Sequence, residues 1–143
     1  MREYVARSIP IYALDLNVPI LSRLFAATYT TSPDALARTP RPANLTPVSK
    51  RTMVGSGPNR FELIPYRTAS GERQMMVYFP DHRLLYTSDL FTIHGPMIFL
   101  PEQVAEAVQA VARERLAVDR AFGMHYDDIP WQTVVDAAAA PGS

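Results

Sequence analysis

The sequence contains no cysteine among its 143 residues. This absence excludes disulfide bridges, a thiolate nucleophile and a zinc site built from cysteine. Basic and acidic residues are equal in number, 14 of each, so the formal net charge is zero. A domain-wide basic field that would favour nucleic acid is therefore absent. Apolar stretches are short as well, and none approaches the roughly 20 residues that a transmembrane helix requires.

The N-terminal segment lacks the uninterrupted apolar stretch of a secretory signal peptide. Arg7, Asp15 and Arg23, together with Pro10 and Pro19, interrupt every apolar run there. We therefore expect no signal peptide and a cytoplasmic location. Apolar residues make up 48% of the chain and charged residues 20%, which is typical of a folded globular protein and not of a disordered one.

The length suits a single domain over residues 1–143, whose two portions differ in regularity. Residues 1–60 form an irregular helical and loop segment. Apolar spacing predicts a short amphipathic helix over 19–29, and Pro33 marks the start of another. Proline-rich loops follow, with a strand expected over 48–54.

Residues 61–140 follow a more regular pattern of strands and helices. Apolar runs at 75–79 and 84–87, separated by turn residues, predict a strand hairpin. Around it we expect a strand over 61–64, a loop over 90–100, a helix over 101–116, a strand over 118–122 and a helix over about 131–140. This order predicts a layered α+β domain with helices packed on a sheet.

Two polar residues stand directly after expected strands, Asp89 after the strand over 84–87 and His125 after the strand over 118–122. The carboxyl ends of strands present functional side chains to a crevice, and a carboxylate with an imidazole suits zinc or iron. An ordinary interpretation exists for the same residues, because an Asp after a strand often forms a turn or caps a helix. Position alone leaves both interpretations open.

Residues 75–91, MMVYFPDHRLLYTSDLF, and 122–131, FGMHYDDIPW, carry a resemblance to a known family. The first segment resembles the metallo-β-lactamase superfamily's strand ending in proline, turn, and strand ending in the metal-bridging Asp. The second is similar to the segment with the family's last metal-ligand His. The resemblance covers residues 60–140 and extends loosely over 1–60. It implies the C-terminal half of the αββα fold, with a mixed or antiparallel sheet flanked by helices.

The resemblance implies a metal-dependent hydrolase that uses zinc or iron, with Asp89 and His125 as metal ligands. The family's main ligand motif, His-x-His-x-Asp-His, has no counterpart in this sequence. The ligand His that normally precedes the strand at 75–79 is missing too. Catalytic zinc typically needs three protein ligands and a water, so two are too few. We therefore expect a truncated or degenerate hydrolase that is inactive alone.

Other polar residues near the implied site are secondary candidates. Arg67 or Arg73 either pairs with Asp89 where metal stands in the family, or is a solvated loop residue. The resemblance puts His94 in a loop near the mouth of the site, which makes it a candidate substrate contact. His82 is expected in an exposed turn without a catalytic role.

A non-catalytic scaffold or binding module is the alternative function. Half of a two-sheet sandwich would expose an apolar sheet face, which needs a cover. The run at 75–79 is the segment that we expect to be covered, either by a second copy in a homodimer or by a complementing chain.

Overall fold

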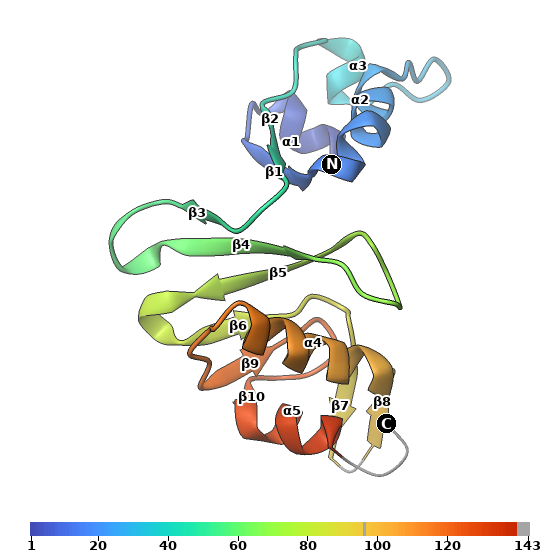
Figure 1. Cartoon of the computed structure of the whole chain (residues 1–143). Coiled ribbons are helices and arrows are strands. Elements are labelled where there is room, and N and C mark those ends of the chain that lie inside the picture. Colours follow the sequence, from blue (N-terminus) through green and yellow to red (C-terminus); the bar gives the residue numbers. More distant parts are fainter. Residues whose placement is uncertain (96, 140–143) are drawn as a thin grey trace. The chain divides into compact units, whose positions relative to one another are not determined.

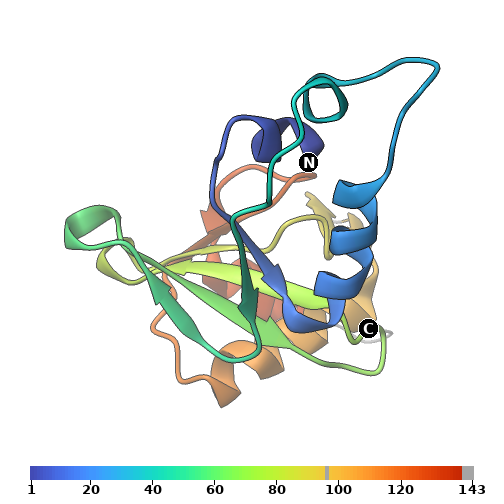
Figure 2. The ribbon, with the colours of Figure 1, turned by 90° about the horizontal axis from the view of Figure 1, so that it is seen from above.

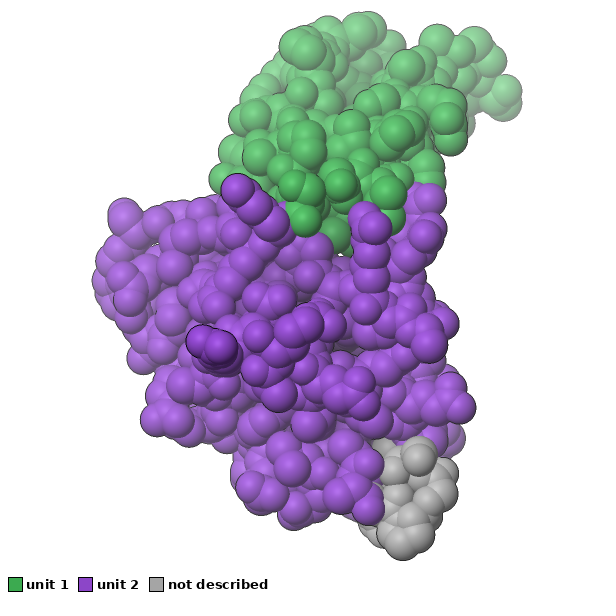
Figure 3. Space-filling model, viewed as in Figure 1, with its two compact units in different colours: residues 1–49 green, residues 50–143 purple. Residues whose placement is uncertain are grey.

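The computed structural model describes residues 1–95 and 97–139. The chain divides into two compact units, Met1–Ser49 and Lys50–Ser143 (Figure 3). Each unit has its own sheet and its own cluster of buried apolar side chains. The division falls inside the segment for which the sequence predicts one strand.

The first unit combines short helices with a two-stranded parallel sheet. Its elements are α1 (Arg2–Ala6), β1 (Ile11–Leu14), the 3-10 turn η1 (Asp15–Asn17), α2 (Val18–Ala26), α3 (Ala35–Arg38) and β2 (Leu45–Val48). Val5, Ile11 and Leu36 form its buried cluster. The two helices expected from the sequence are confirmed, and a long loop joins them (Figure 2).

The single strand expected over 48–54 is wrong. Val48 is the last residue of β2, and a new strand, β3, begins at Thr52. β2 pairs with β1 of the first unit, whereas β3 pairs with β4 of the second. Because the two strands have different hydrogen-bonding partners, the chain must leave one sheet before it enters the other.

A buried arginine links the three helices of the first unit. Arg2 is 8% exposed, and its Nε and Nη2 donate to Asp34 Oδ2 and Oδ1 at 2.7 and 3.0 Å. Its Nη1 donates to the carbonyl oxygens of Leu24 and Phe25, both at 2.8 Å. The Tyr29 ring centre lies 4.7 Å from the guanidinium carbon. Arg2 in α1 therefore holds the C-terminal end of α2 and the N-cap of α3.

This arrangement predicts acid sensitivity of the first unit. The hydrogen bond from Arg2, with that from the Ala37 N–H, lowers the pKa of Asp34 from 3.8 to about 2. A carboxylate with a lowered pKa in the folded state contributes stability above its unfolded pKa, and that contribution disappears as the pH falls through the folded value. We expect the urea midpoint of first-unit amide signals, followed by NMR, to fall between pH 3.8 and about 2.

Asp34→Asn should remove this pH dependence, because an amide does not titrate in this range. Asp15→Asn is the matched control in the same unit, since the Asp15 carboxylate accepts a local hydrogen bond from the Leu16 N–H. Equal acid dependence in wild type and Asp34→Asn would contradict the prediction.

The second unit is a six-stranded mixed sheet with two helices and a separate hairpin (Figure 1). Its elements are β3 (Thr52–Val54), η2 (Gly57–Asn59), β4 (Phe61–Tyr66), β5 (Gln74–Phe79), η3 (Pro80–His82), β6 (Leu84–Tyr86), β7 (Thr92–His94), β8 (Met97–Phe99), α4 (Pro101–Arg113), β9 (Arg120–Phe122), β10 (Ile129–Pro130) and α5 (Trp131–Ala138). The strand order is β10-β9-β6-β5-β4-β3, with only the β6–β9 pair parallel. The predicted α+β class, with a mixed sheet and flanking helices, is confirmed.

One face of this sheet packs against α4 and α5. Met76 and Tyr78 alternate along β5 with Val77 and Phe79, and only the first pair is buried in the core cluster. The helices contribute buried residues to that cluster at Val104, Ala107, Ala110, Val111, Val134 and Ala137. Among the described residues no helix has the length and apolar character needed to cross a bilayer.

Two expectations for the second unit are corrected. Residues 90–100 do not form a simple loop, because β7 and β8 pair there as an antiparallel hairpin. The helix expected over 101–116 ends at Arg113, since Arg115 has a left-handed φ of 53°. The hairpin at 75–87 and the strand before His125 are confirmed.

Candidate functional site

Asp89 and His125 follow two strands that are neighbours in the sheet. β6 and β9 pair in parallel, with Tyr86 opposite Phe122 at their ends. Parallel neighbours finish at the same edge of a sheet, and a crossover through α4 connects them here. The fold therefore brings together the two segments that the sequence marks as candidate ligand carriers.

Backbone hydrogen bonds join these two segments beyond the strand ends. The Thr87 N–H donates to the Phe122 carbonyl oxygen at 3.0 Å, and the Met124 N–H donates to the Ser88 carbonyl oxygen at 2.7 Å. Ser88 has a left-handed φ of 58°, which is uncommon for a residue with a side chain. This conformation redirects the chain between the end of β6 and Asp89.

A buried tyrosine contacts residues of both segments. The Tyr126 hydroxyl lies 2.6 Å from the Thr87 hydroxyl, and its ring stacks on Phe91 with centres 5.4 Å apart. Burial raises the pKa of Tyr126 to about 12, so the phenol is neutral at physiological pH. Tyr126 thus connects the segment after β9 to the segment after β6. Nothing in the sequence identified this contact, since Tyr126 is distant from Thr87 along the chain.

The side chains of Asp89 and His125 are exposed. Ser88 Oγ donates to Asp89 Oδ1 at 3.3 Å. Within residues 1–95 and 97–139, no group of three or more His, Cys, Asp or Glu side chains could hold a metal ion. The donors at this edge therefore do not fit a complete catalytic zinc or iron site, which needs at least three protein ligands. The assignment of Asp89 and His125 as ligands stays a prediction.

The connection between β4 and β5 lies at the same sheet edge. Tyr66 pairs with Gln74 at the loop end of that hairpin, and Val77 of β5 is opposite Tyr86 of β6. Arg67 and Arg73 belong to this connection, which precedes β5. Both arginines are exposed, and the Arg73 Nε donates to Glu72 Oε1 at 3.3 Å.

A carboxylate of α4 holds this connection. Glu106 accepts hydrogen bonds from the Ser70 N–H, at 3.0 Å, and from the Ser70 hydroxyl. Burial raises the pKa of Glu106, but the hydrogen bonds from Ser70 and Thr68 outweigh it and leave the pKa below its ordinary value. The Thr68 N–H and the Gly71 carbonyl close the turn at 3.0 Å. The polar loop between β4 and β5 is thus hydrogen-bonded to α4.

The two remaining histidines lie outside the β6–β9 edge, in η3 and at the end of β7. His82 is exposed in η3, as expected, and its Nε2 is 3.1 Å from the Pro58 carbonyl oxygen. His94 is the exposed last residue of β7, at the turn of the β7–β8 hairpin. Its role as a substrate contact stays a prediction.

Comparison with solved structures identifies the class of fold. The chain is similar to a metallo-β-lactamase from Pontibacter korlensis, with a TM-score of 0.63 and 12% identity over 97% of this chain and 60% of that one. It is also similar to the rubredoxin oxygen:oxidoreductase from Desulfovibrio gigas, with a TM-score of 0.61 and 12% identity over 91% and 36% of the two chains. The flavodiiron core of Flv1 from Synechocystis sp. PCC6803 matches with a TM-score of 0.59 and 13% identity over 92% and 37%.

The fold is therefore that of the metallo-β-lactamase-fold proteins, and the resemblance inferred from the sequence is confirmed at the level of fold. The chain spans only 60% of the Pontibacter enzyme, which is consistent with a half-fold. No family model and no curated relative matches the sequence.

Proposed function

We propose that the chain is a degenerate, shortened form of a metallo-β-lactamase-fold hydrolase that does not hydrolyse a substrate alone. The observation that carries the proposal is the parallel β6–β9 pair, which delivers Asp89 and His125 to one sheet edge. Both residue types suit zinc or iron, and the named neighbours include a metallo-β-lactamase and a flavodiiron core.

Inactivity of the isolated chain follows from the donors at that edge. The connection between β4 and β5 offers arginines and a hydrogen-bonded polar turn where a third ligand would be needed. With two protein ligands, water fills most coordination positions of a metal ion. The affinity for the metal is then low and its coordination geometry is not fixed. Function as a hydrolase would then require further ligands from another polypeptide segment.

A zinc titration of the purified chain tests this proposal. We expect less than one equivalent of zinc to remain after dialysis, measured by elemental analysis, and iron to behave in the same way. Hydrolysis of a β-lactam, a p-nitrophenyl ester, a thioester and a phosphodiester should be no faster than with the Asp89→Ala/His125→Ala double variant. His82→Ala is the control for adventitious binding to an exposed histidine.

One or two equivalents of tightly bound zinc, lost in the double variant and kept in His82→Ala, would overturn the proposal. Weak binding that NMR localises to Asp89 and His125 at high zinc concentration would support it, because it shows a pair of ligands without companions.

The second candidate is a non-catalytic oligomeric scaffold. Apolar side chains that line a hollow in the second unit favour it. Phe61, Val77, Phe79, Tyr86 and Phe122 line a shallow hollow of about 340 Å³ in the second unit. Two ring pairs contribute to it, with centres 6.0 Å apart for Phe61–Phe79 and 4.9 Å for Tyr86–Phe122. Apolar aromatic surface of this kind favours association, and in this candidate function a second copy of the chain covers it.

Sedimentation velocity at several concentrations measures this association. We expect a dimer for the wild type and a monomer for Val77→Lys, because a charge in the hollow must be desolvated on pairing. Ile20→Lys is the matched control, since Ile20 is 47% exposed on α2 of the first unit. A monomeric wild type at every concentration contradicts the homodimer and leaves a complementing chain as the cover to be sought.

A further inference from the structure

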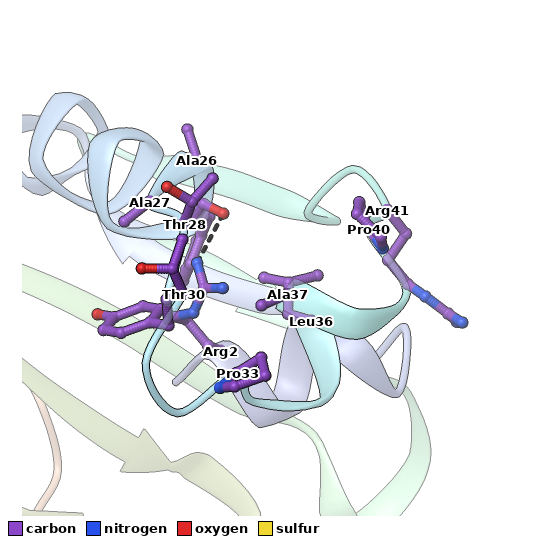
Figure 4. Close-up of a pocket in the computed structure, with 12 residues that line it drawn as sticks. Arg2, Ala26, Ala27, Thr28, Thr30, Pro33, Leu36, Ala37, Pro40 and Arg41 are labelled. Atoms are coloured by element: carbon purple, nitrogen blue, oxygen red, sulfur yellow. Dashed lines mark hydrogen bonds between the residues drawn. The ribbon is translucent and has the colours of Figure 1, made fainter.

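The first unit contains a pocket of about 540 Å³, and all its lining residues belong to that unit (Figure 4). None of them is near Asp89 or His125 in the sequence. The loop after α2, the short helix α3 and Arg2 of α1 form its walls. Figure 4 shows Leu36 and Ala37 on one side and Thr28 and Thr30 on the other. Its volume falls within the range of about 300–1,000 Å³ that is usual for small-molecule sites.

The lining of this pocket is mostly apolar and has no acidic side chain. Phe25, Leu36 and Pro40 provide apolar wall, and the threonine hydroxyls provide neutral polar atoms. The charged residues of the lining are both arginines, Arg2 and Arg41. An apolar wall with a few cationic donors suits a ligand with an apolar body and an anionic group.

Arg2 is a fixed donor in this wall. A guanidinium carries five N–H groups, and the contacts to Asp34, Leu24 and Phe25 use four of them. Among the described residues, these contacts leave one N–H of Nη2 without a hydrogen-bond partner, on a side chain that Asp34 and two carbonyl oxygens hold in place. Such preorganisation lowers the entropic cost of binding.

Arg41 supplies the uncompensated charge. Asp34 neutralises Arg2, whereas Arg41 is exposed and donates to the Ser8 hydroxyl at 3.0 Å. Over the described part of the chain, no carboxylate forms an ion pair with Arg41. Figure 4 shows Arg41 beside Pro40 at the edge of the pocket, with its side chain extending away from Arg2. Its contribution is therefore a positive field at the rim and not a hydrogen bond beside Arg2.

We propose that this pocket is a binding site for a small organic carboxylate or similar anion with a compact apolar body. The apolar walls hold the body, the free Nη2 N–H of Arg2 donates to the anionic group, and Arg41 raises its local concentration. This proposal is independent of any role of Asp89 and His125.

Two probes of equal size test the chemical class of ligand on the full-length chain. We expect 1-naphthoate to bind saturably, with NMR shift changes confined to first-unit amides. Neutral 1-naphthalenemethanol should bind about tenfold more weakly, because its hydroxyl oxygen accepts the Arg2 N–H without the negative charge that strengthens the bond to a carboxylate. Equal affinity for the two probes overturns the anionic class, and no saturable binding of either overturns the site.

Pocket variants give a second, independent readout. Ala37→Leu fills the cavity and should weaken 1-naphthoate binding by at least about tenfold, whereas the same change at the exposed Ala112 of α4 should have no effect. Arg41→Gln should weaken binding by about two- to fivefold, as expected for an exposed charge. Arg23→Gln, an exposed arginine outside the lining, is its control. Wild-type affinity in Ala37→Leu places the probe elsewhere and contradicts the proposal.

Discussion

Replacing Phe91 with alanine is expected to lower the free energy of unfolding of the second unit by about 3–5 kcal/mol. Phe91 has no exposed surface and stacks on the Tyr126 ring with planes 14° apart. Its removal takes away buried apolar area and leaves a cavity below the segments that carry Asp89 and His125. A loss of this size is large against a typical stability of about 5–15 kcal/mol.

Urea unfolding followed by the fluorescence of Trp131 measures this loss within the second unit. Trp131 is the single tryptophan of the chain and packs against the core cluster that contains Phe91. Phe91→Leu should cost much less, because most of the volume is kept. Phe79→Ala is the matched truncation on the other sheet face, where the side chain is half-buried. A loss in Phe91→Ala no larger than in Phe79→Ala would contradict the prediction.

The second unit was largely predictable because its elements have strong local signals. The apolar run at 75–79 alternates between two sheet faces, and proline with turn residues separates it from the next strand. Pro101 stands at the first turn of α4, where its missing N–H has no helical partner to lose. Local chemistry of this kind determines the element without help from distant contacts.

The failures fall where pairing is non-local or elements are very short. β7 and β8 have three residues each, too few to show a strand period, so residues 90–100 read as a loop. The segment over 48–54 carries residues that suit a strand, but which sheet each part joins depends on β1 and β4, which lie elsewhere in the chain. Sequence periodicity contains no information about such partners.

The candidate site shows the same division between local and distant information. Asp89 and His125 were identified because each follows an expected strand in a segment that resembles the metallo-β-lactamase superfamily, and the parallel β6–β9 pair places the two segments at one edge. The Thr87–Tyr126 hydrogen bond and the Ser70–Glu106 contact join residues 39 and 36 positions apart, so no local pattern reveals them. These contacts position the loops at this end of the sheet, whereas the sequence shows only which residues belong to the loops.

Replacing Gly123 with alanine is expected to lower the free energy of unfolding by about 1–3 kcal/mol, the usual cost of forcing atoms into a filled space. A Cβ at this position would lie 2.9 Å from the Ser88 carbonyl oxygen and closer still to the Tyr126 ring. Neither neighbour moves easily. The Ser88 carbonyl accepts the Met124 N–H, and Tyr126 is 6% exposed.

Gly71→Ala is the control, because the three atoms nearest to its Cβ would all belong to the side chain of Gln74, whose end can rotate away. Its stability should change by less than about 0.5 kcal/mol. Urea unfolding by Trp131 fluorescence again gives the measurement. A Gly123→Ala variant as stable as Gly71→Ala would show that the segments after β6 and β9 are less closely packed than the structure describes.

A double-mutant cycle separates the two contacts at Gly123. In a Tyr126→Ala background the ring is gone, so the further loss caused by Gly123→Ala should shrink and the two changes should be clearly non-additive. The part that persists reports the Ser88 carbonyl, because that oxygen remains 2.9 Å from the new Cβ. Full additivity would mean that the ring does not restrict residue 123. The predicted coupling instead means that the close contact between the Asp89 and His125 segments requires a residue without a Cβ at position 123.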